Sequence, residues 1–299
     1  MIKAYCVAGH TFHLVMPDSH RLWSCLDQYA PFLAEPVEDP VFTLRMVEDL
    51  PEGDMTPVYT TEGDEEGMPR LDMFELGAGG YIVDMAPILS APTSGRLHIA
   101  AGYKDAGLKI LKEGRNASLF SLNNSLMLMF AFSTADKMTL EMHSSVVSNG
   151  GKGYLFLGKS GSGKSTHSSL WLKYIEGSSL MNDDNPVLKV EDDGTIMIYG
   201  SPWSGKTPCY RNVQAPVGAL VLIRQAPYNK ITRQGLLESY ATVYSSCSGF
   251  KADLAMGDSL HRTLEKVVLG VPCYTLECLP DEDAAKVCSR EVKGEVANG

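Results

Sequence analysis

The sequence predicts an α/β protein of two domains, a smaller α+β domain over residues 1–135 and a core with a mixed central sheet and flanking helices over residues 136–299. In the first part, short apolar runs are separated by Gly, Pro and Ser turns, a pattern typical of antiparallel strands. After residue 139, strand patterns alternate with helical ones. With 299 residues, 44% of them hydrophobic, the chain is long and apolar enough to pack both domains.

The amino-terminal part begins with alternating apolar residues, and a helix that starts at Asp18 is expected to bury an apolar face next. A strand is predicted at 41–46. Segment 48–69 is rich in Glu, Asp, Gly and Pro, which predicts a loop or an exposed hairpin. The residues expected on the buried face of the helix are Leu22, Trp23, Leu26 and Tyr29.

An antiparallel sheet and a buried helix are predicted to complete the first domain. The cluster at 77–80 contains Gly77, Gly79 and Gly80 but lacks the third glycine of a dinucleotide fingerprint, and no helical pattern follows, so it predicts a tight turn. A mostly buried helix is predicted over 118–133. The strands are expected at 72–76, 81–85, 96–103 and 107–111.

The second domain is expected to begin with a strand at 139–147, followed by a turn at 149–151 and a buried strand at 154–157. A helix over 165–175 then carries Leu170, Leu172 and Ile175 and is stopped by Gly177. The remaining expectations are a strand at 179–182, a hairpin of 187–190 with 195–199, a strand at 219–223, a helix at 258–268, a strand at 274–277 and a last helix from Asp281.

Residues 158–165 read Gly-Lys-Ser-Gly-Ser-Gly-Lys-Ser, a complete G-x-x-x-x-G-K-[ST] phosphate-binding loop (P-loop) between a predicted strand and a predicted helix. Lys164 is expected to reach the β and γ phosphates of ATP, and Ser165 to offer its hydroxyl to Mg²⁺. The alternative, a flexible surface turn, does not require this flanking order. The predicted nucleotide-binding residues of the loop are Gly158, Lys159, Ser160, Gly161, Ser162, Gly163, Lys164, Ser165 and Thr166.

Two adjacent carboxylates, Asp183 and Asp184, follow Asn182 at the end of the next short strand. An acidic residue there can reach Mg²⁺ directly or through water, so both are candidate metal ligands with Ser165. Neighbouring side chains on an extended strand point in opposite directions, so one carboxylate faces the site unless the chain turns there. The alternative is a solvated turn before Pro186.

These features together resemble the HPr serine kinase/phosphorylase family, whose nucleotide core is shared with phosphoenolpyruvate carboxykinase. The resemblance spans about residues 139–224 and includes His143, the P-loop and the Asp pair. It implies that Asp183 is the catalytic base, that Asp184 helps to handle the metal or the proton, and that His143 lies close to the transferred phosphate. A structural His on a strand is the alternative for His143. The Arg-Gly-x-Gly signature of the family does not follow the Asp pair, so the carrier protein HPr is not implied as the acceptor.

The segment 201–207 and Arg211 combine a flexible glycine with cations and an aromatic residue. It could form a lid that brings Lys206 or Arg211 onto the γ phosphate, where cations stabilise the transferring charge. A surface loop with a packed Trp203 is the alternative.

The function predicted from these residues is an ATP-dependent kinase that phosphorylates a hydroxyl, expected to be that of a serine, on a protein, peptide or small molecule. Its predicted catalytic residues are Asp183, Asp184, His143 and Lys164. The alternative is a non-catalytic ATP-binding regulatory or accessory protein. An ATPase motor would need sensor and arginine-finger motifs, which are not recognisable. The first domain is expected to select the acceptor or to mediate assembly, including homo-oligomerisation, and nothing separates ATP from GTP.

Composition argues against several other classes of protein. The net charge of -10, without a Lys/Arg-rich run, disfavours nucleic acid or an anionic membrane as a partner. Apolar stretches are too short to cross a bilayer, and no apolar leader is evident, so we expect a cytoplasmic protein. Seven cysteines without C-x-x-C spacing predict reduced thiols rather than a disulfide framework or a zinc site.

Overall fold

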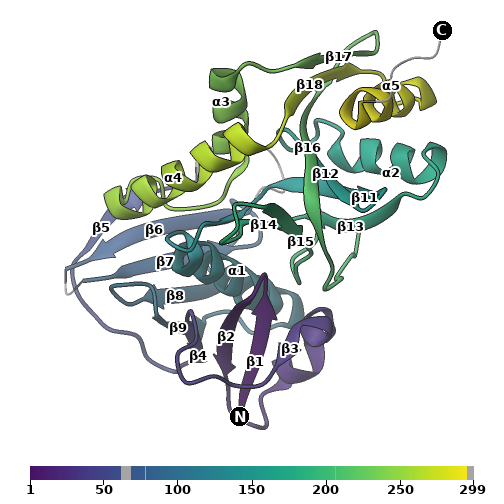
Figure 1. Ribbon diagram of the computed structural model, residues 1–299. Helices are drawn as coiled ribbons and strands as arrows, with labels where there is room; N and C mark the ends of the chain where they lie inside the picture. The colour runs from purple at the N-terminus through teal and green to yellow at the C-terminus, as the bar shows by residue number, and fades with distance from the viewer. Residues whose placement is uncertain (62–68, 78, 206, 295–299) are drawn as a thin grey trace, which may run out of the picture. The chain divides into compact units, whose positions relative to one another are not determined.

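A computed structural model of the protein describes residues 1–61, 69–77, 79–205 and 207–294 (Figure 1). The chain divides into two compact units, Met1–Thr134 and Ala135–Gly299, which are described separately. This division lies one residue from the predicted domain boundary. Each unit contains a mixed sheet with helices, so the protein is α/β.

In the described part of the amino-terminal unit, nine strands form one sheet in the order β3-β1-β2-β4-β9-β8-β7-β6-β5. The strands β9, β8, β7, β6 and β5 pair antiparallel with one another in this order and contain the predicted antiparallel group. The helix α1 packs against β7, β8 and β9. The elements are β1 (Ile2–Val7), β2 (His10–Val15), the 3-10 helices η1 (Arg21–Cys25) and η2 (Asp27–Phe32), β3 (Leu33–Ala34), β4 (Thr43–Met46), β5 (Met55–Tyr59), β6 (Arg70–Leu76), β7 (Tyr81–Ala86), β8 (Gly95–Ile99), β9 (Asp105–Ile110) and α1 (Arg115–Thr134).

Two predictions for this unit need correction or refinement. The helix expected from Asp18 is instead a pair of 3-10 helices, and Trp23 is only partly buried because its indole N–H reaches out to the carbonyl of Pro17. Part of the acidic segment 48–69 forms β5, which pairs with β6, so the hairpin alternative is correct for the described residues. The predicted turn between β6 and β7 is confirmed at Gly79 and Gly80, which have positive φ.

The carboxy-terminal unit is built on a mixed sheet in the order β10-β14-β15-β16-β12-β11-β13, and β18 also pairs with β16 and with β17. The long strand β16 joins its two parts, pairing with β15 at its start and with β12 and β18 further on. The elements are β10 (Thr139–Glu141), β11 (Ser144–Asn149), β12 (Lys152–Leu157), α2 (Lys164–Tyr174), β13 (Ser179–Asp184), β14 (Val187–Val190), β15 (Ile196–Tyr199), β16 (Gln214–Gln225), β17 (Lys230–Arg233), α3 (Leu236–Ser246), α4 (Leu254–Gly270), β18 (Cys273–Cys278) and α5 (Glu282–Lys293).

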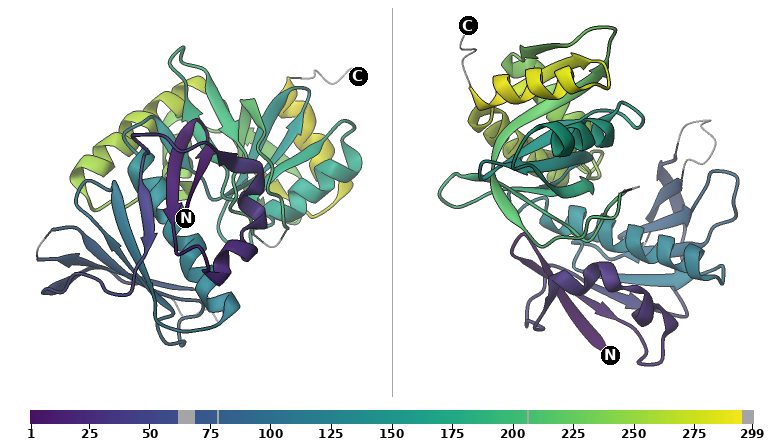
Figure 2. Two further views of the ribbon diagram at one scale, coloured as in Figure 1. Left: turned by 90° about the horizontal axis from the view of Figure 1, so that it is seen from below. Right: turned by 90° about the vertical axis from the view of Figure 1, so that its right-hand side faces the viewer.

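The helices of this unit cover the two faces of the sheet. In Figures 1 and 2, α2 and α5 lie side by side on one face, and α3 and α4 lie on the other. The core beneath α2 is aromatic: Trp171 is fully buried and its ring lies 5.1 Å from Tyr154 and 5.5 Å from Phe156. This packing fixes α2 against β12 and therefore positions both ends of the segment 158–163 that joins them.

Three details of this unit differ from the sequence prediction. The single strand expected over 139–147 is broken at His143, because β10 pairs with β14 whereas β11 pairs with β12 and β13. On α2, Trp171 rather than Leu172 faces the core, and Leu172 is 41% exposed. The sequence pattern also missed α3 and β17. The hairpin β11–β12, the hairpin β14–β15, α4, β18 and α5 are confirmed.

Within the described residues, no helix is both long and apolar enough to span a membrane.

Candidate functional site

The glycine-rich loop at 158–165 connects the end of β12 to the start of α2 and requires glycine for its shape. Gly158 has φ 142°, and a Cβ there would lie 2.5 Å from the Ser162 hydroxyl and 3.2 Å from the carbonyl oxygen of Ile223. Gly163, the N-cap of α2, has the left-handed φ of 105°. L side chains rarely adopt such angles, so the backbone conformation of the loop requires glycine at these two positions of the motif.

The amino-terminal end of α2 is suited to an anion. Its N-cap glycine offers no side-chain cap, and the first turn contains no acidic residue. The first N–H groups of a helix have no intrahelical acceptor and carry the positive end of the helix dipole. Such an end favours phosphate, and here it opens beside several charged groups that the loop and β13 provide.

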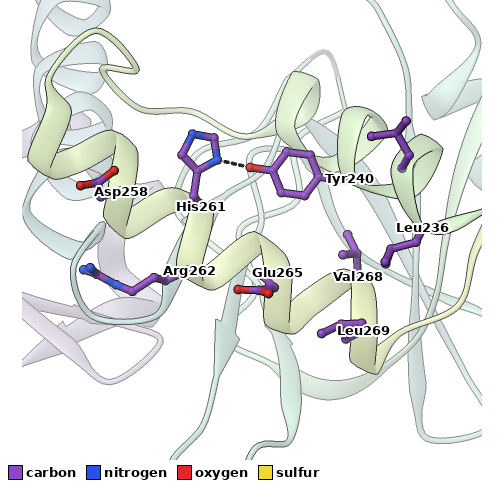
Figure 3. Close-up of a pocket in the computed structure, with 9 residues that line it drawn as sticks. Leu236, Tyr240, Asp258, His261, Arg262, Glu265, Val268 and Leu269 are labelled. Atoms are coloured by element: carbon purple, nitrogen blue, oxygen red, sulfur yellow. Dashed lines mark hydrogen bonds between the residues drawn. The ribbon is translucent and has the colours of Figure 1, made fainter.

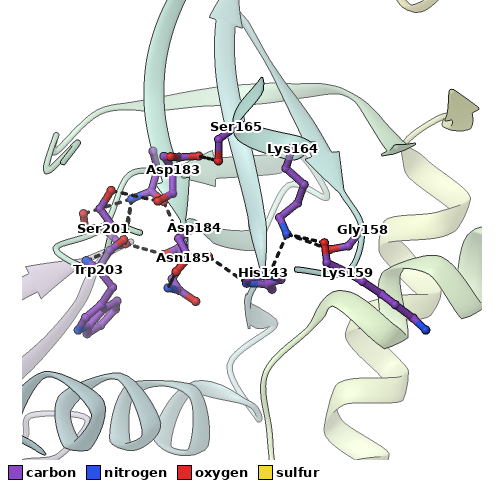
Figure 4. Close-up of polar contacts among 12 residues, drawn as sticks. His143, Gly158, Lys159, Lys164, Ser165, Asp183, Asp184, Asn185, Ser201 and Trp203 are labelled. Carbon is purple, nitrogen blue, oxygen red and sulfur yellow. Dashed lines mark hydrogen bonds and ion pairs between the residues drawn. The ribbon is translucent and has the colours of Figure 1, made fainter. Parts of the chain in front are cut away.

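Lys164 is folded back over the loop. Its Nζ lies 2.9 Å from His143 Nε2, and it donates to the carbonyl oxygens of Gly158 at 2.9 Å and Lys159 at 3.3 Å (Figure 4). Burial lowers the Lys164 pKa, and the carboxylates of Asp184 and Asp183 oppose this effect. The ammonium group is therefore held in a partly desolvated position, where its attraction for an anion is stronger than in water.

Asp183 lies on β13 opposite the start of α2. Ser165 Oγ donates a hydrogen bond of 2.9 Å to its Oδ1, whereas its Oδ2 is buried without a hydrogen-bond partner among the described residues. The strand end is fixed from behind, because the amide of Asn182 donates to the carbonyl oxygen of Trp203 at 3.1 Å. Asp183 is 3% exposed, and a buried carboxylate oxygen without a hydrogen-bond partner is energetically costly.

Asp184 is the point where the strand turns. Its φ of 135° is outside the range that non-glycine residues normally adopt. Because of this turn, Asp183 and Asp184 both line the same cavity instead of facing opposite sides of the sheet. Asp184 Oδ1 lies 3.0 Å from His143 Nδ1. Backbone strain of this kind clusters at functional sites.

His143 connects Asp184 to Lys164. It lies in the break between β10 and β11 rather than within a strand, and its backbone N–H donates to the carbonyl of Ser246. Since an ammonium group only donates, Nε2 of the neutral ring accepts from Lys164 and Nδ1 carries the proton that faces Asp184. The result is a continuous chain from Lys164 through His143 to Asp184, as Figure 4 shows.

Glu141 is a group that the sequence interpretation missed. It lies on β10, two residues before His143, it is 1% exposed, and both of its carboxyl oxygens lack partners among the described residues. Burial, reinforced by the negative charge of Asp184, raises its pKa well above the usual value. The signal available in the sequence was a charged residue placed between two apolar residues, Leu140 and Met142, of a predicted strand.

The loop, β13 and His143 enclose a cavity of about 410 Å³. Of the predicted site residues, His143, Asp183 and Asp184 line it together with residues of the loop and the first turn of α2. Gly205 is a further lining residue, and its N–H donates to the carbonyl of Asp183. The lining residues of the loop and first turn are Ser160, Gly161, Gly163, Lys164, Ser165 and Thr166.

The other predicted residues lie elsewhere. Gly158 and Lys159 contact Lys164 through their carbonyl groups, and Ser162 lines a neighbouring cavity. Arg211 is exposed, and its guanidinium donates to the carbonyl of Leu180, so it does not line the 410 Å³ cavity. Lys206 lies outside the described residues. Trp203 is buried, in agreement with the packed-Trp alternative for this segment.

The residues present fit a magnesium ion. Mg²⁺ binds oxygen ligands and usually takes one or two from the protein, with phosphates and waters completing its shell. The hydroxyl of Ser165 and the carboxylate of Asp183 already lie together, and Asp183 Oδ2 is an unpaired buried acceptor. Among the described residues there is no cluster of three or more His, Cys, Asp and Glu side chains that could hold a metal by itself.

A separate cavity of about 650 Å³ lies between α3 and α4 (Figure 3). It is lined by leucines and by a Tyr240–His261 pair whose rings stack 5.9 Å apart and whose polar atoms are hydrogen-bonded. It includes no residue of the glycine-rich loop and none of the carboxylates of β13.

No protein-family model matches the chain, and no curated protein matches it either.

Proposed function

We propose that the protein is an ATP-dependent kinase with a nucleotide core of the HPr kinase and phosphoenolpyruvate carboxykinase type, and that it phosphorylates a hydroxyl group. The observation that carries the proposal is the meeting of a lysine, a hydroxyl, two carboxylates and a histidine around one cavity at the open end of α2. Phosphoryl transfer requires little more than such positioned charges, a metal ion and an acceptor held in line.

The contacts favour a particular division of labour between the two carboxylates. Asp183 faces Ser165, whose hydroxyl is expected to bind Mg²⁺, so Asp183 suits the metal. Asp184 faces His143, so Asp184 suits the proton of the acceptor hydroxyl. The family resemblance, by contrast, implied that Asp183 is the catalytic base. Mg²⁺, when bound, would neutralise charge on the β and γ phosphates.

In this scheme Lys164 interacts either with His143 and the loop carbonyls or with a phosphate of the nucleotide. In the structure Lys164 is held by His143 and by loop carbonyls, all of them neutral acceptors. A phosphate offers a stronger, charge-assisted hydrogen bond. Binding of the nucleotide would draw Lys164 away from His143, which leaves His143 Nε2 free to accept a proton or a hydrogen bond beside the transferred group.

The test is transfer of labelled γ-phosphate from ATP to free serine, to peptides and to a cell extract by the wild type, Asp183→Asn and Asp184→Asn. Removal of a general base lowers rates by roughly 10²–10⁴-fold, so Asp184→Asn is expected to bind Mg·ATP normally and to lose transfer. Asp183→Asn is expected to need more Mg²⁺ for binding. Wild-type binding of ATP without transfer to any acceptor would instead favour a regulatory nucleotide-binding protein.

A further inference from the structure

A second cavity, of about 620 Å³, adjoins the 410 Å³ cavity on the other side of the glycine-rich loop. The two cavities share Gly161, Gly163 and Thr166. The second one is formed at the ends of β16 and β18, and its walls are mostly apolar. They include Leu170, Ile223, Pro227, Leu279 and Pro280.

The strand order gives the direction in which a ligand would run. β13, which carries Asp183 and Asp184, lies on one side of β12, whereas β16 and β18 lie on the other. A nucleotide whose terminal phosphate lies near the two carboxylates, with its other phosphates over the loop, therefore directs its nucleoside toward the ends of β16 and β18. The apolar cavity lies at that position.

Two residues that line this cavity, Ser162 and His167, each carry a buried polar atom. Ser162 Oγ and His167 Nδ1 are buried and make no hydrogen bond among the described residues. Trp171 Nε1 donates to His167 Nε2 at 3.1 Å, so in the neutral ring the proton must lie on Nδ1, which is therefore a donor. Ser162 Oγ is directed toward Gly158 at the base of the loop, and the His167 ring packs against Phe156, so the polar character of the cavity lies at its rim.

The rim of this cavity is tied to the loop. The amide of Gln225, at the end of β16, donates a hydrogen bond of 3.1 Å to the carbonyl oxygen of Gly161. Gln225 and Gly161 both line the second cavity. An occupant of this cavity would thus contact the same backbone segment that holds the phosphates.

We propose that this cavity holds the base and ribose of the nucleotide whose phosphates bind the glycine-rich loop. The apolar walls suit the faces of a planar ring, and the exposed amide of Gln225 at the rim suits its heteroatoms or the ribose hydroxyls. This inference rests on the proposed function for the phosphate end of the ligand, and it adds the site that makes the protein prefer a nucleotide over a bare polyphosphate.

The experiment compares the binding of ATP and of inorganic tripolyphosphate, each with Mg²⁺, by calorimetry. The wild type is expected to bind ATP about tenfold or more tightly than tripolyphosphate, because burial of the base adds apolar contact that tripolyphosphate lacks. Ala226→Phe, which fills the cavity, is expected to lower the affinity for ATP and leave that for tripolyphosphate unchanged. The matched control Ala255→Phe, on the exposed side of α4, is expected to change neither.

A second variant decides the matter if Ala226→Phe fails to fold or weakens both ligands. Leu279→Asn changes a wall residue that is 39% exposed, so it should be tolerated, and it is expected to weaken ATP alone. Equal wild-type affinity for ATP and tripolyphosphate would overturn the inference while leaving the phosphate site intact. An unchanged affinity ratio in Leu279→Asn and in any folded Ala226→Phe would also overturn it. Failure of both ligands to bind the wild type would instead contradict the proposed function itself.

Discussion

Replacement of His167 by glutamine is expected to remove a specific pH dependence from the stability of the protein. His167 lies on α2 directly after the glycine-rich loop and is 1% exposed. Its ring meets Phe156 edge-on at 4.7 Å, and its Nε2 accepts from Trp171. Burial lowers its pKa from 6.5 to about 4, because the charged ring would lose its hydration in this core.

The direction and size of the effect follow from proton binding. Between pH 6.5 and about 4 the unfolded chain binds a proton at His167 and the folded chain does not, so stability falls as the pH falls through this window. Above pH 6.5 His167 is neutral in both the folded and the unfolded state, so its titration no longer lowers the stability. A pKa difference of this size corresponds to about 3 kcal/mol at its limit, with a slope of about 1.4 kcal/mol per pH unit.

Urea unfolding of the wild type and His167→Gln at several pH values measures this directly. Glutamine stays neutral and retains an acceptor for Trp171. The variant therefore loses the titrating group while the hydrogen bond to Trp171 can be kept. The free energy of unfolding of the wild type, relative to the variant, should fall by about 2 kcal/mol between pH 7 and pH 5. A difference that does not change with pH would refute the reasoning that His167 is buried and neutral.

Other changes near the site have equally definite outcomes. Asp184→Gly should raise the free energy of unfolding by about 1 kcal/mol, since glycine accepts the φ of 135° without strain, while phosphate transfer is lost; lower stability by denaturant titration would contradict this. Glu141→Gln should be more stabilising at pH 8 than at pH 5. Because burial raises the Glu141 pKa, the folded protein retains this proton at pH values where the unfolded chain releases it, so wild-type stability declines as the pH rises above about 4.3; equal stabilisation at both pH values would oppose it. His143→Ala should preserve binding of Mg·ADP and slow transfer, because Asp184 loses its partner; unchanged transfer kinetics would show that the pair is only structural.

The local geometry of the loop was predictable because it depends on neighbouring residues. Gly158 and Gly163 stand where the backbone has positive φ, and the strand before them and the helix after them have strong apolar patterns. The expectation that Ser165 and the Asp pair share a site also agrees with their contacts, since Ser165 donates to Asp183.

Features that depend on distant segments were not predictable in this way. The apolar pattern continues through 139–147, but the chain changes pairing partners at His143, so the strand breaks there. The turn at Asp184 is accompanied by an isolated bridge to Ser204, twenty residues later in the chain. α3 was missed because Leu236 and Leu237 are adjacent and exposed, which gives no helical periodicity at its start.

The account depends most directly on nucleotide binding at the loop, which calorimetry of Mg·ATP with the wild type and Lys164→Ala measures. Lys173→Ala, on the last turn of the same helix, is the matched control. The account predicts that the wild type and Lys173→Ala bind ATP with the same affinity and that Lys164→Ala binds at least about tenfold more weakly, since a charge-assisted contact to phosphate is lost. Equal binding by Lys164→Ala, or no binding by the wild type, would contradict it.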